Sequence, residues 1–209
     1  MKSIQQFLQE ALIFSDKTII TDKEKFEDGT YKCLIVLGLC GSGKTTFGKY
    51  LATQYKCKYV QLDDVCNNFL INLYGDEDWS AKYGYTETVE KHREDFQREI
   101  LKLLKRTKIK SIMEGTWPLQ GSPILTEKFL PYPIVFMGTS LLRSQFQWQR
   151  REWTKWWNRT RSLKKAGRKI KEAPHMFNLM RNVDKVMQDM KKKKLAQGVT
   201  VEEYKVPKL

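Results

Sequence analysis

The chain alternates short apolar runs with segments whose apolar residues recur at helical spacing. The runs predict five strands, at residues 31–37, 57–62, 110–113, 132–137 and 198–204. The spacing predicts helices over about residues 4–14, 44–55, 65–73 and 86–105, and over most of residues 141–195, with breaks at Ala166-Gly167 and Ala173-Pro174. Thr18–Thr21 is a candidate short strand, and a charged turn is expected over 22–30.

This alternation of strands and helices predicts an α/β fold with a mostly parallel sheet and helices on both faces. A length of 209 residues suits one domain with a proper core. We expect residues 1–30 to form a lead-in that packs on the outside of that core. An apolar stripe of mostly methionine on the last helix is interpreted as core packing rather than a partner groove. It consists of Met176, Leu179, Met180, Val183, Met187 and Met190.

A glycine-rich loop follows the strand at 31–37 and fits the pattern G-x-x-x-x-G-K-[ST]. Such a loop wraps phosphates with backbone N–H groups that converge at a helix N-terminus. Lys44 would reach the β- and γ-phosphates, and the Thr45 hydroxyl would bind Mg²⁺. The alternative is an ordinary strand-turn-helix corner. The candidate nucleotide-binding residues are Gly38, Cys40, Gly41, Ser42, Gly43, Lys44, Thr45 and Thr46.

Composition excludes several other classes of protein. Apolar residues make up 41% and charged residues 30%, with no run of 18 apolar residues, so no membrane association is expected. The first residues lack a hydrophobic signal core, and the four cysteines form no C-x-x-C pair. We therefore expect reduced thiols in a cytoplasmic protein. With only His92 and His175 present, a histidine-based metal site is not expected.

Carboxylates follow two of the expected strands. Asp63-Asp64 comes after the strand at 57–62, and Glu114 comes after the strand at 110–113. In a parallel sheet ligands sit beyond the carboxyl ends of the strands, where the glycine-rich loop also lies. One carboxylate there can orient Mg²⁺ and another can accept a proton from an attacking hydroxyl. The alternatives are a helix N-cap for Asp63-Asp64 and a solvated strand end for Glu114.

These residues resemble the P-loop kinases of the adenylate kinase-like type, which include polynucleotide 5′-kinases. The resemblance covers roughly residues 31–160 and the last strand. The stretch Glu114-Gly115-x-x-Pro118 looks like the family's Asp-Gly-x-Pro turn, with Glu for Asp and one extra residue. The resemblance implies a three-layer P-loop NTPase fold, with a five-stranded mostly parallel sheet and a basic helical lid. It also implies ATP and Mg²⁺ as cofactors, Thr45 and Glu114 at the metal, and Asp63 or Asp64 as base.

The same resemblance places a mobile lid after the strand at 132–137. Its arginines would neutralise the phosphoryl group in transfer, and the matching residues are Arg143, Arg150 and Arg151. On one helix the spacings of seven and eight residues put all three on roughly one side. The alternative for each is a solvated basic face.

The net charge of +14 is concentrated in this part of the chain. Residues 143–195 carry 17 Lys and Arg against 4 Asp and Glu, whereas residues 1–142 carry 19 against 18. Four of the six tryptophans lie among these cations, a combination that suits a polyanion whose bases can stack. The alternative is that the tryptophans pack the lid onto the core. The candidate nucleic-acid contacts are Trp148, Trp153, Lys155, Trp156, Trp157, Arg159 and Arg161.

The sequence thus predicts an ATP- and Mg²⁺-dependent kinase that phosphorylates a hydroxyl on DNA, RNA or a nucleotide. The hydroxyl is a 5′-end or belongs to a modified base bearing a hydroxymethyl group, a reaction known for some phage P-loop kinases. Two alternatives stay open: a (deoxy)nucleoside monophosphate kinase, and a nucleic-acid-binding protein switched by a nucleotide. The absence of an N-K-x-D motif weighs against a GTPase.

Overall fold

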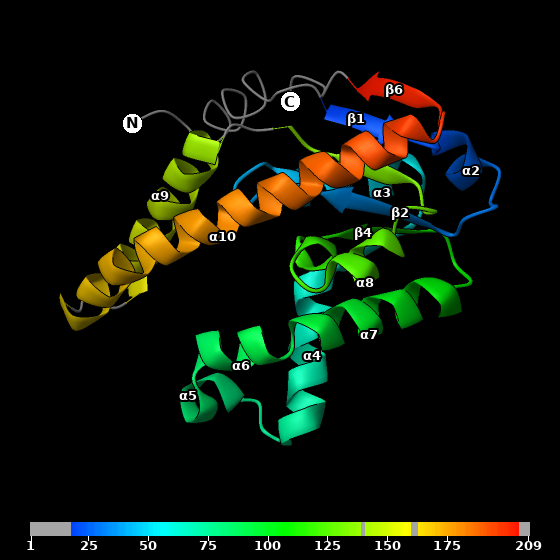
Figure 1. Cartoon of the computed structure of the whole chain (residues 1–209). Helices are drawn as coiled ribbons and strands as arrows, with labels where there is room; N and C mark the ends of the chain where they lie inside the picture. The colour runs from blue at the N-terminus through cyan, green and yellow to red at the C-terminus, as the bar shows by residue number, and fades with distance from the viewer. Residues whose placement is uncertain (1–17, 139–140, 160–162, 205–209) are drawn as a thin grey trace.

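A mixed six-stranded sheet forms the centre of the molecule, in the order β3-β4-β2-β5-β1-β6 (Figure 1). The computed structural model describes residues 18–138, 141–159 and 163–204, with only part of the side chains in the last two helices. The strands are β1 (Thr18–Thr21), β2 (Cys33–Leu37), β3 (Lys58–Gln61), β4 (Ser111–Glu114), β5 (Ile134–Phe136) and β6 (Val201–Tyr204). β3, β4, β2 and β5 are parallel neighbours, so their carboxyl ends meet at one edge.

The expected count of five strands is wrong because β1 belongs to the sheet. It lies between β5 and β6 and is antiparallel to both, so β6 runs in the same direction as the four parallel strands. All four residues of β1 are buried, and the Thr21 hydroxyl donates a hydrogen bond to the Ile134 carbonyl at 3.2 Å. A hydroxyl that forms a hydrogen bond can be buried at little cost in free energy. This segment is therefore core, not an external lead-in; the expected helix at 4–14 lies outside the described residues.

Helices cover both faces of the sheet, as the alternation predicted. Along β2 the buried side chains alternate between two clusters, with Leu34 and Val36 on one face and Ile35 and Leu37 on the other. The first face packs against α2 (Lys23–Glu27) and α3 (Lys44–Gln54). The second face packs against α4 (Leu62–Tyr74), α7 (Arg93–Arg106) and α10 (Leu163–Ala196), and the chain between β4 and β5 adds η1 (Trp117–Leu119) and α8 (Pro123–Glu127).

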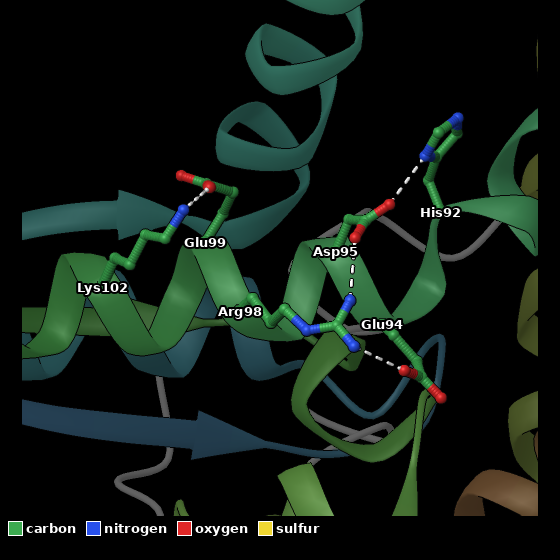
Figure 2. A network of polar contacts seen from close by, with 6 residues as sticks. All are labelled: His92, Glu94, Asp95, Arg98, Glu99 and Lys102. Carbon is green, nitrogen blue, oxygen red and sulfur yellow. Dashed lines mark hydrogen bonds and ion pairs between the residues drawn. The ribbon is translucent and has the colours of Figure 1, made fainter.

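The connection from β3 to β4 contains more helices than expected. α5 (Trp79–Tyr83) lies in a stretch for which no helix was predicted, and the single helix predicted at 86–105 is divided into α6 (Tyr85–Lys91) and α7. The division falls at His92, which is buried and has φ −106° and ψ 13°. Its Nδ1 lies 2.9 Å from the Asp95 carboxylate (Figure 2). Its Nε2 lies 3.0 Å from the Tyr74 hydroxyl. These two contacts fix the ring between α4 and α7 and stabilise the interruption between α6 and α7.

The basic C-terminal region forms two long helices, α9 (Leu141–Arg159) and α10. The predicted breaks at Ala166-Gly167 and Ala173-Pro174 are wrong, because α10 continues through both. A proline inside a helix costs about 3 kcal/mol. Burial of the apolar stripe offsets this cost: Met180, Val183, Met187 and Met190 are all buried, which confirms their role in core packing.

The end of α10 is fixed to the sheet by a buried lysine. The Lys194 side chain is only 1% exposed and forms an ion pair with Asp22, which is also buried. Lys194 also donates hydrogen bonds to the carbonyls of Leu130 and Tyr132. These contacts fasten α10 to β1 and to the turn before β5. Within the described part of the chain, no helix is long and apolar enough to cross a membrane.

Candidate functional site

The glycine-rich loop lies where predicted, between the end of β2 and the start of α3. α3 begins at Lys44, so Thr45 and Thr46 lie in its first turn. Gly41 has φ +82°, and a Cβ added there would come within 2.8 Å of the Gln147 Cβ. Only glycine therefore fits, both for the backbone angle and for the approach of α9. The Lys44 ammonium group is half-buried and donates a hydrogen bond to the Leu39 carbonyl at 3.3 Å, within its own loop.

Glu114 from β4 reaches the start of α3 and is 3% exposed. Its Oε1 accepts hydrogen bonds from the Thr45 hydroxyl at 3.1 Å, the Tyr59 hydroxyl at 3.1 Å and the Gln61 side-chain amide at 3.4 Å. Its Oε2 is buried and accepts no hydrogen bond from any described residue. The structure thus brings together Thr45 and Glu114, the two residues predicted to hold a metal.

Tyr59 and Gln61, which the sequence analysis missed, hold this carboxylate in place. They lie two residues apart on β3, so both side chains point to the same face, and Gln61 is paired with Glu114 in the sheet register. Burial and the neighbouring Glu114 charge raise the pKa of the Tyr59 hydroxyl, which keeps it a hydrogen-bond donor. Gly48 of α3 leaves room for this arrangement, because a Cβ there would lie 3.0 Å from the Tyr59 ring.

Asp63 and Asp64 lie in the first turn of α4 and are exposed. Neither caps the helix: the N-cap is Gln61, and no side-chain cap hydrogen bond forms. The two differ in their surroundings, because the Trp117 indole N–H donates to the Asp63 Oδ1 at 2.6 Å. No described group donates a hydrogen bond to the Asp64 side chain. Trp117, from η1 just after β4, therefore gives Asp63 a fixed orientation.

Helix α9 lies directly against the glycine-rich loop. The Ser144 hydroxyl is fully buried, donates a hydrogen bond to the Cys40 carbonyl and lies 3.7 Å from the Met180 sulfur of α10. Sequence reasoning missed Ser144 and Gln147, because no spacing links them to a loop about 100 residues earlier. The contact couples the loop to both long helices.

The predicted lid and nucleic-acid residues are only partly within the described structure. Arg150 and Arg151 are exposed on α9, whereas the side chain of Arg143 is outside the described residues. Trp148 is 6% exposed, so its prediction as a nucleic-acid contact is wrong and it packs inside; Trp153 is 44% exposed. The side chains of the remaining candidates lie outside the described residues: Lys155, Trp156, Trp157, Arg159 and Arg161.

The described residues contain no group of three or more His, Cys, Asp or Glu side chains placed to hold a metal ion. A metal at the loop would thus depend on the oxygens of Thr45 and Glu114 together with those of a bound ligand. The Ser42 hydroxyl is also buried there without a hydrogen-bond partner among the described residues. Unpartnered buried polar atoms are rare in folded proteins and call for an explanation.

Comparison with known proteins adds no family assignment. No protein-family model matches the chain, and no curated protein is significantly similar to it.

Proposed function

We propose that this protein is an ATP- and Mg²⁺-dependent kinase that transfers the γ-phosphoryl group to a hydroxyl on a nucleic acid or nucleotide. The observation that carries the proposal is the contact between Glu114 and Thr45. This contact brings a buried carboxylate to the first turn of the helix that follows a glycine-rich loop, and one oxygen of this carboxylate accepts no hydrogen bond from the described residues. Burying a carboxylate oxygen without a partner is costly, and a cation or its bound water would repay that cost.

The donor would be held by the loop and by Lys44. The loop supplies backbone N–H groups at the amino end of α3, where the helix dipole favours phosphate. Lys44 would exchange its hydrogen bond with the Leu39 carbonyl for phosphate oxygens. Mg²⁺, when bound, neutralises charge on the transferring phosphates. The Thr45 hydroxyl and Glu114 would hold it, with Tyr59 and Gln61 fixing the carboxylate.

The acceptor would lie beyond the ends of β3 and β4, beside Asp63. Asp63 is exposed and held by Trp117, so it can receive the proton of an attacking hydroxyl. The exposed Arg150 and Arg151 belong to the helix that packs on the loop, and guanidinium groups suit phosphoryl oxygens. The strand order supports a P-loop type of fold. β2 lies near the centre of the sheet, the chain after β2 leads to β3 on one side, and the chain after β5 leads to β6 on the other side.

The test is transfer from γ-labelled ATP to DNA, RNA and free nucleotides. The wild type should label a polynucleotide, and Lys44→Ala should lower the rate by at least about 100-fold. Lys128→Ala, at an exposed lysine outside the site, is the matched control and should keep full activity. The kinase proposal fails if nothing is labelled while nucleic-acid binding changes with the bound nucleotide. Labelling of free nucleotides alone, unchanged by added DNA, would identify a nucleoside monophosphate kinase instead.

A further inference from the structure

A cluster of cations lies at the amino ends of β2, β3 and β4, at the opposite edge of the sheet from the glycine-rich loop. The sheet register pairs Cys33 and Lys58 with Ser111, so the turns that precede these strands are neighbours. The Ser111 N–H donates to the Lys32 carbonyl at 2.8 Å, and the Lys58 N–H donates to the Lys110 carbonyl at 3.1 Å. Lys32, Lys58 and Lys110 therefore lie side by side although they are far apart in the sequence.

The three turns, residues 29–32, 53–58 and 105–110, contain seven cations and no carboxylate. Six of these cations have exposed side chains, and we call them the basic edge: Lys32, Lys56, Lys58, Lys105, Arg106 and Lys108. The seventh, Lys110, is half-buried and donates a hydrogen bond to the Glu27 carbonyl. The basic edge thus joins one end of the sheet to the end of α7 (Figure 1).

Neighbouring carboxylates do not neutralise this charge. Glu99 forms an ion pair with Lys102 (Figure 2). Lys102 lies three residues before Lys105 and is not part of the basic edge. Glu27 interacts with Lys23 and with the Tyr55 hydroxyl, and Asp28 accepts a hydrogen bond from the backbone of its own turn. No member of the basic edge forms an ion pair with an acidic residue in the described part of the chain. Six exposed cations therefore face solvent together.

Ordinary structural needs account for only part of the cluster. Lys105 and Arg106 lie in the last turn of α7, where cations compensate the helix dipole. Lys56 has no such reason, and its φ of +47° puts a lysine in a conformation better suited to glycine or asparagine. The basic edge therefore includes a lysine, Lys56, at a position whose backbone conformation disfavours lysine.

We propose that the basic edge binds the phosphodiester backbone of a nucleic acid. Neighbouring strands are about 4.8 Å apart, so the cations form a row along which a charged backbone can lie. The same turns carry exposed Thr30 and Gln54, whose side chains can donate hydrogen bonds to phosphate oxygens. A membrane-binding surface would combine the cations with several inserting apolar side chains, but Ile109 is the one large apolar residue exposed in the three turns.

This surface is separate from the reacting site. β2 spans five residues, so about 17 Å of sheet separates the basic edge from the glycine-rich loop. A mononucleotide in the loop cannot reach it, whereas a polynucleotide can contact both. The proposal therefore extends the proposed kinase function to a long acceptor, but it does not require that the protein be a kinase.

The test is the binding of a fluorescent single-stranded DNA of about 30 nucleotides, measured by anisotropy without ATP. The variant combines Lys56→Asn, which tolerates the positive φ, with Lys58→Gln and Lys108→Gln. Three lost phosphate contacts should weaken binding about 100-fold at about 0.1 M salt and reduce the slope of log K against log salt by about 2. The matched control combines Lys82→Gln, Lys91→Gln and Lys128→Gln, three exposed lysines elsewhere, and should bind within a few-fold of wild type.

Circular dichroism checks that each variant folds; if the triple variant does not, Lys58→Gln with Lys108→Gln should still weaken binding about 25-fold. The proposal is overturned if the folded variant binds DNA as the control does. It is also overturned if wild type binds anionic phosphatidylserine vesicles through these lysines and binds no DNA. Because ATP is absent, failure here leaves the kinase proposal intact, and a chain that transfers no phosphate can still satisfy this test.

Discussion

The buried ion pair between Lys194 and Asp22 leads to a quantitative prediction: Lys194→Met should lower the free energy of unfolding by about 3 kcal/mol. The two side chains are 1% and 2% exposed, and removing one partner of such a pair typically costs about 3–5 kcal/mol. The lower end applies because Asp22 keeps its ion pair with Lys25 at 2.7 Å. Methionine keeps most of the volume of the lysine stem, so the loss reports the charge and its hydrogen bonds rather than a cavity.

The assay is urea unfolding followed by far-ultraviolet circular dichroism. In thermal unfolding followed by the same signal, a loss of about 3 kcal/mol in a chain of this length lowers Tm by roughly 6–12 °C. The control is Lys192→Met, at an exposed position on the same helix, which should change stability by less than about 0.5 kcal/mol. The double variant Lys194→Met with Asp22→Asn should recover part of this loss, because it no longer buries a carboxylate charge that has lost one of its two cationic partners. A loss below about 1 kcal/mol for Lys194→Met would refute this reasoning.

The same pair predicts how stability depends on pH. Burial opposes the charge on Asp22, but the contacts with Lys194 and Lys25 outweigh it and hold the pKa of this carboxyl below its ordinary value. A carboxyl whose pKa is lower in the folded state stabilises the fold above its unfolded pKa, about 3.9, and this contribution disappears as the pH falls through the folded value. The stability difference between wild type and Asp22→Asn should therefore be constant near neutral pH and shrink below about pH 4.

Two further predictions concern the candidate site. Tyr59→Phe removes a hydrogen bond to Glu114 and should raise the Mg²⁺ concentration needed for half-maximal phosphoryl transfer about tenfold; an unchanged Mg²⁺ titration would contradict it. Asp63→Asn should lower the rate of transfer at least about 100-fold, whereas Asp64→Asn should change it less than about threefold, because only Asp63 is oriented by Trp117. Equal losses in the two variants, measured with γ-labelled ATP, would exclude this assignment.

The sequence pattern correctly predicted those elements whose structure depends on nearby residues. The apolar run before the glycine-rich loop became a fully buried central strand, and the methionine stripe packs into the core. The predictions failed where distant contacts decide the structure. β1 is a sheet strand because β5 and β6, both more than 100 residues away in the sequence, supply its partners. α10 continues through Pro174 because the packing of the helix outweighs the local cost of a proline. The sequence alone shows the proline but not the packing.

The candidate site divides in the same way. Thr45 and Glu114 could be predicted as neighbours because Glu114 ends one parallel strand, Thr45 follows another, and the carboxyl ends of parallel strands meet. Tyr59, Gln61 and Ser144 could not, since their roles depend on sheet register and on the seating of α9. Trp148 shows the opposite error: an aromatic residue among arginines suits nucleic acid, but here its side chain is buried.

Charge shows most clearly why the sequence could not reveal the basic edge. Counted along the chain, residues 1–142 are nearly neutral, with 19 cations against 18 carboxylates. The fold separates these charges in space. Many of the carboxylates pair with lysines and arginines on helices α2 and α7. The turns before three strands and the last turn of α7 bring six exposed cations together at one edge of the sheet. An electrostatic surface follows from sheet register, so a segment that looks balanced in sequence can still present a polyanion-binding face.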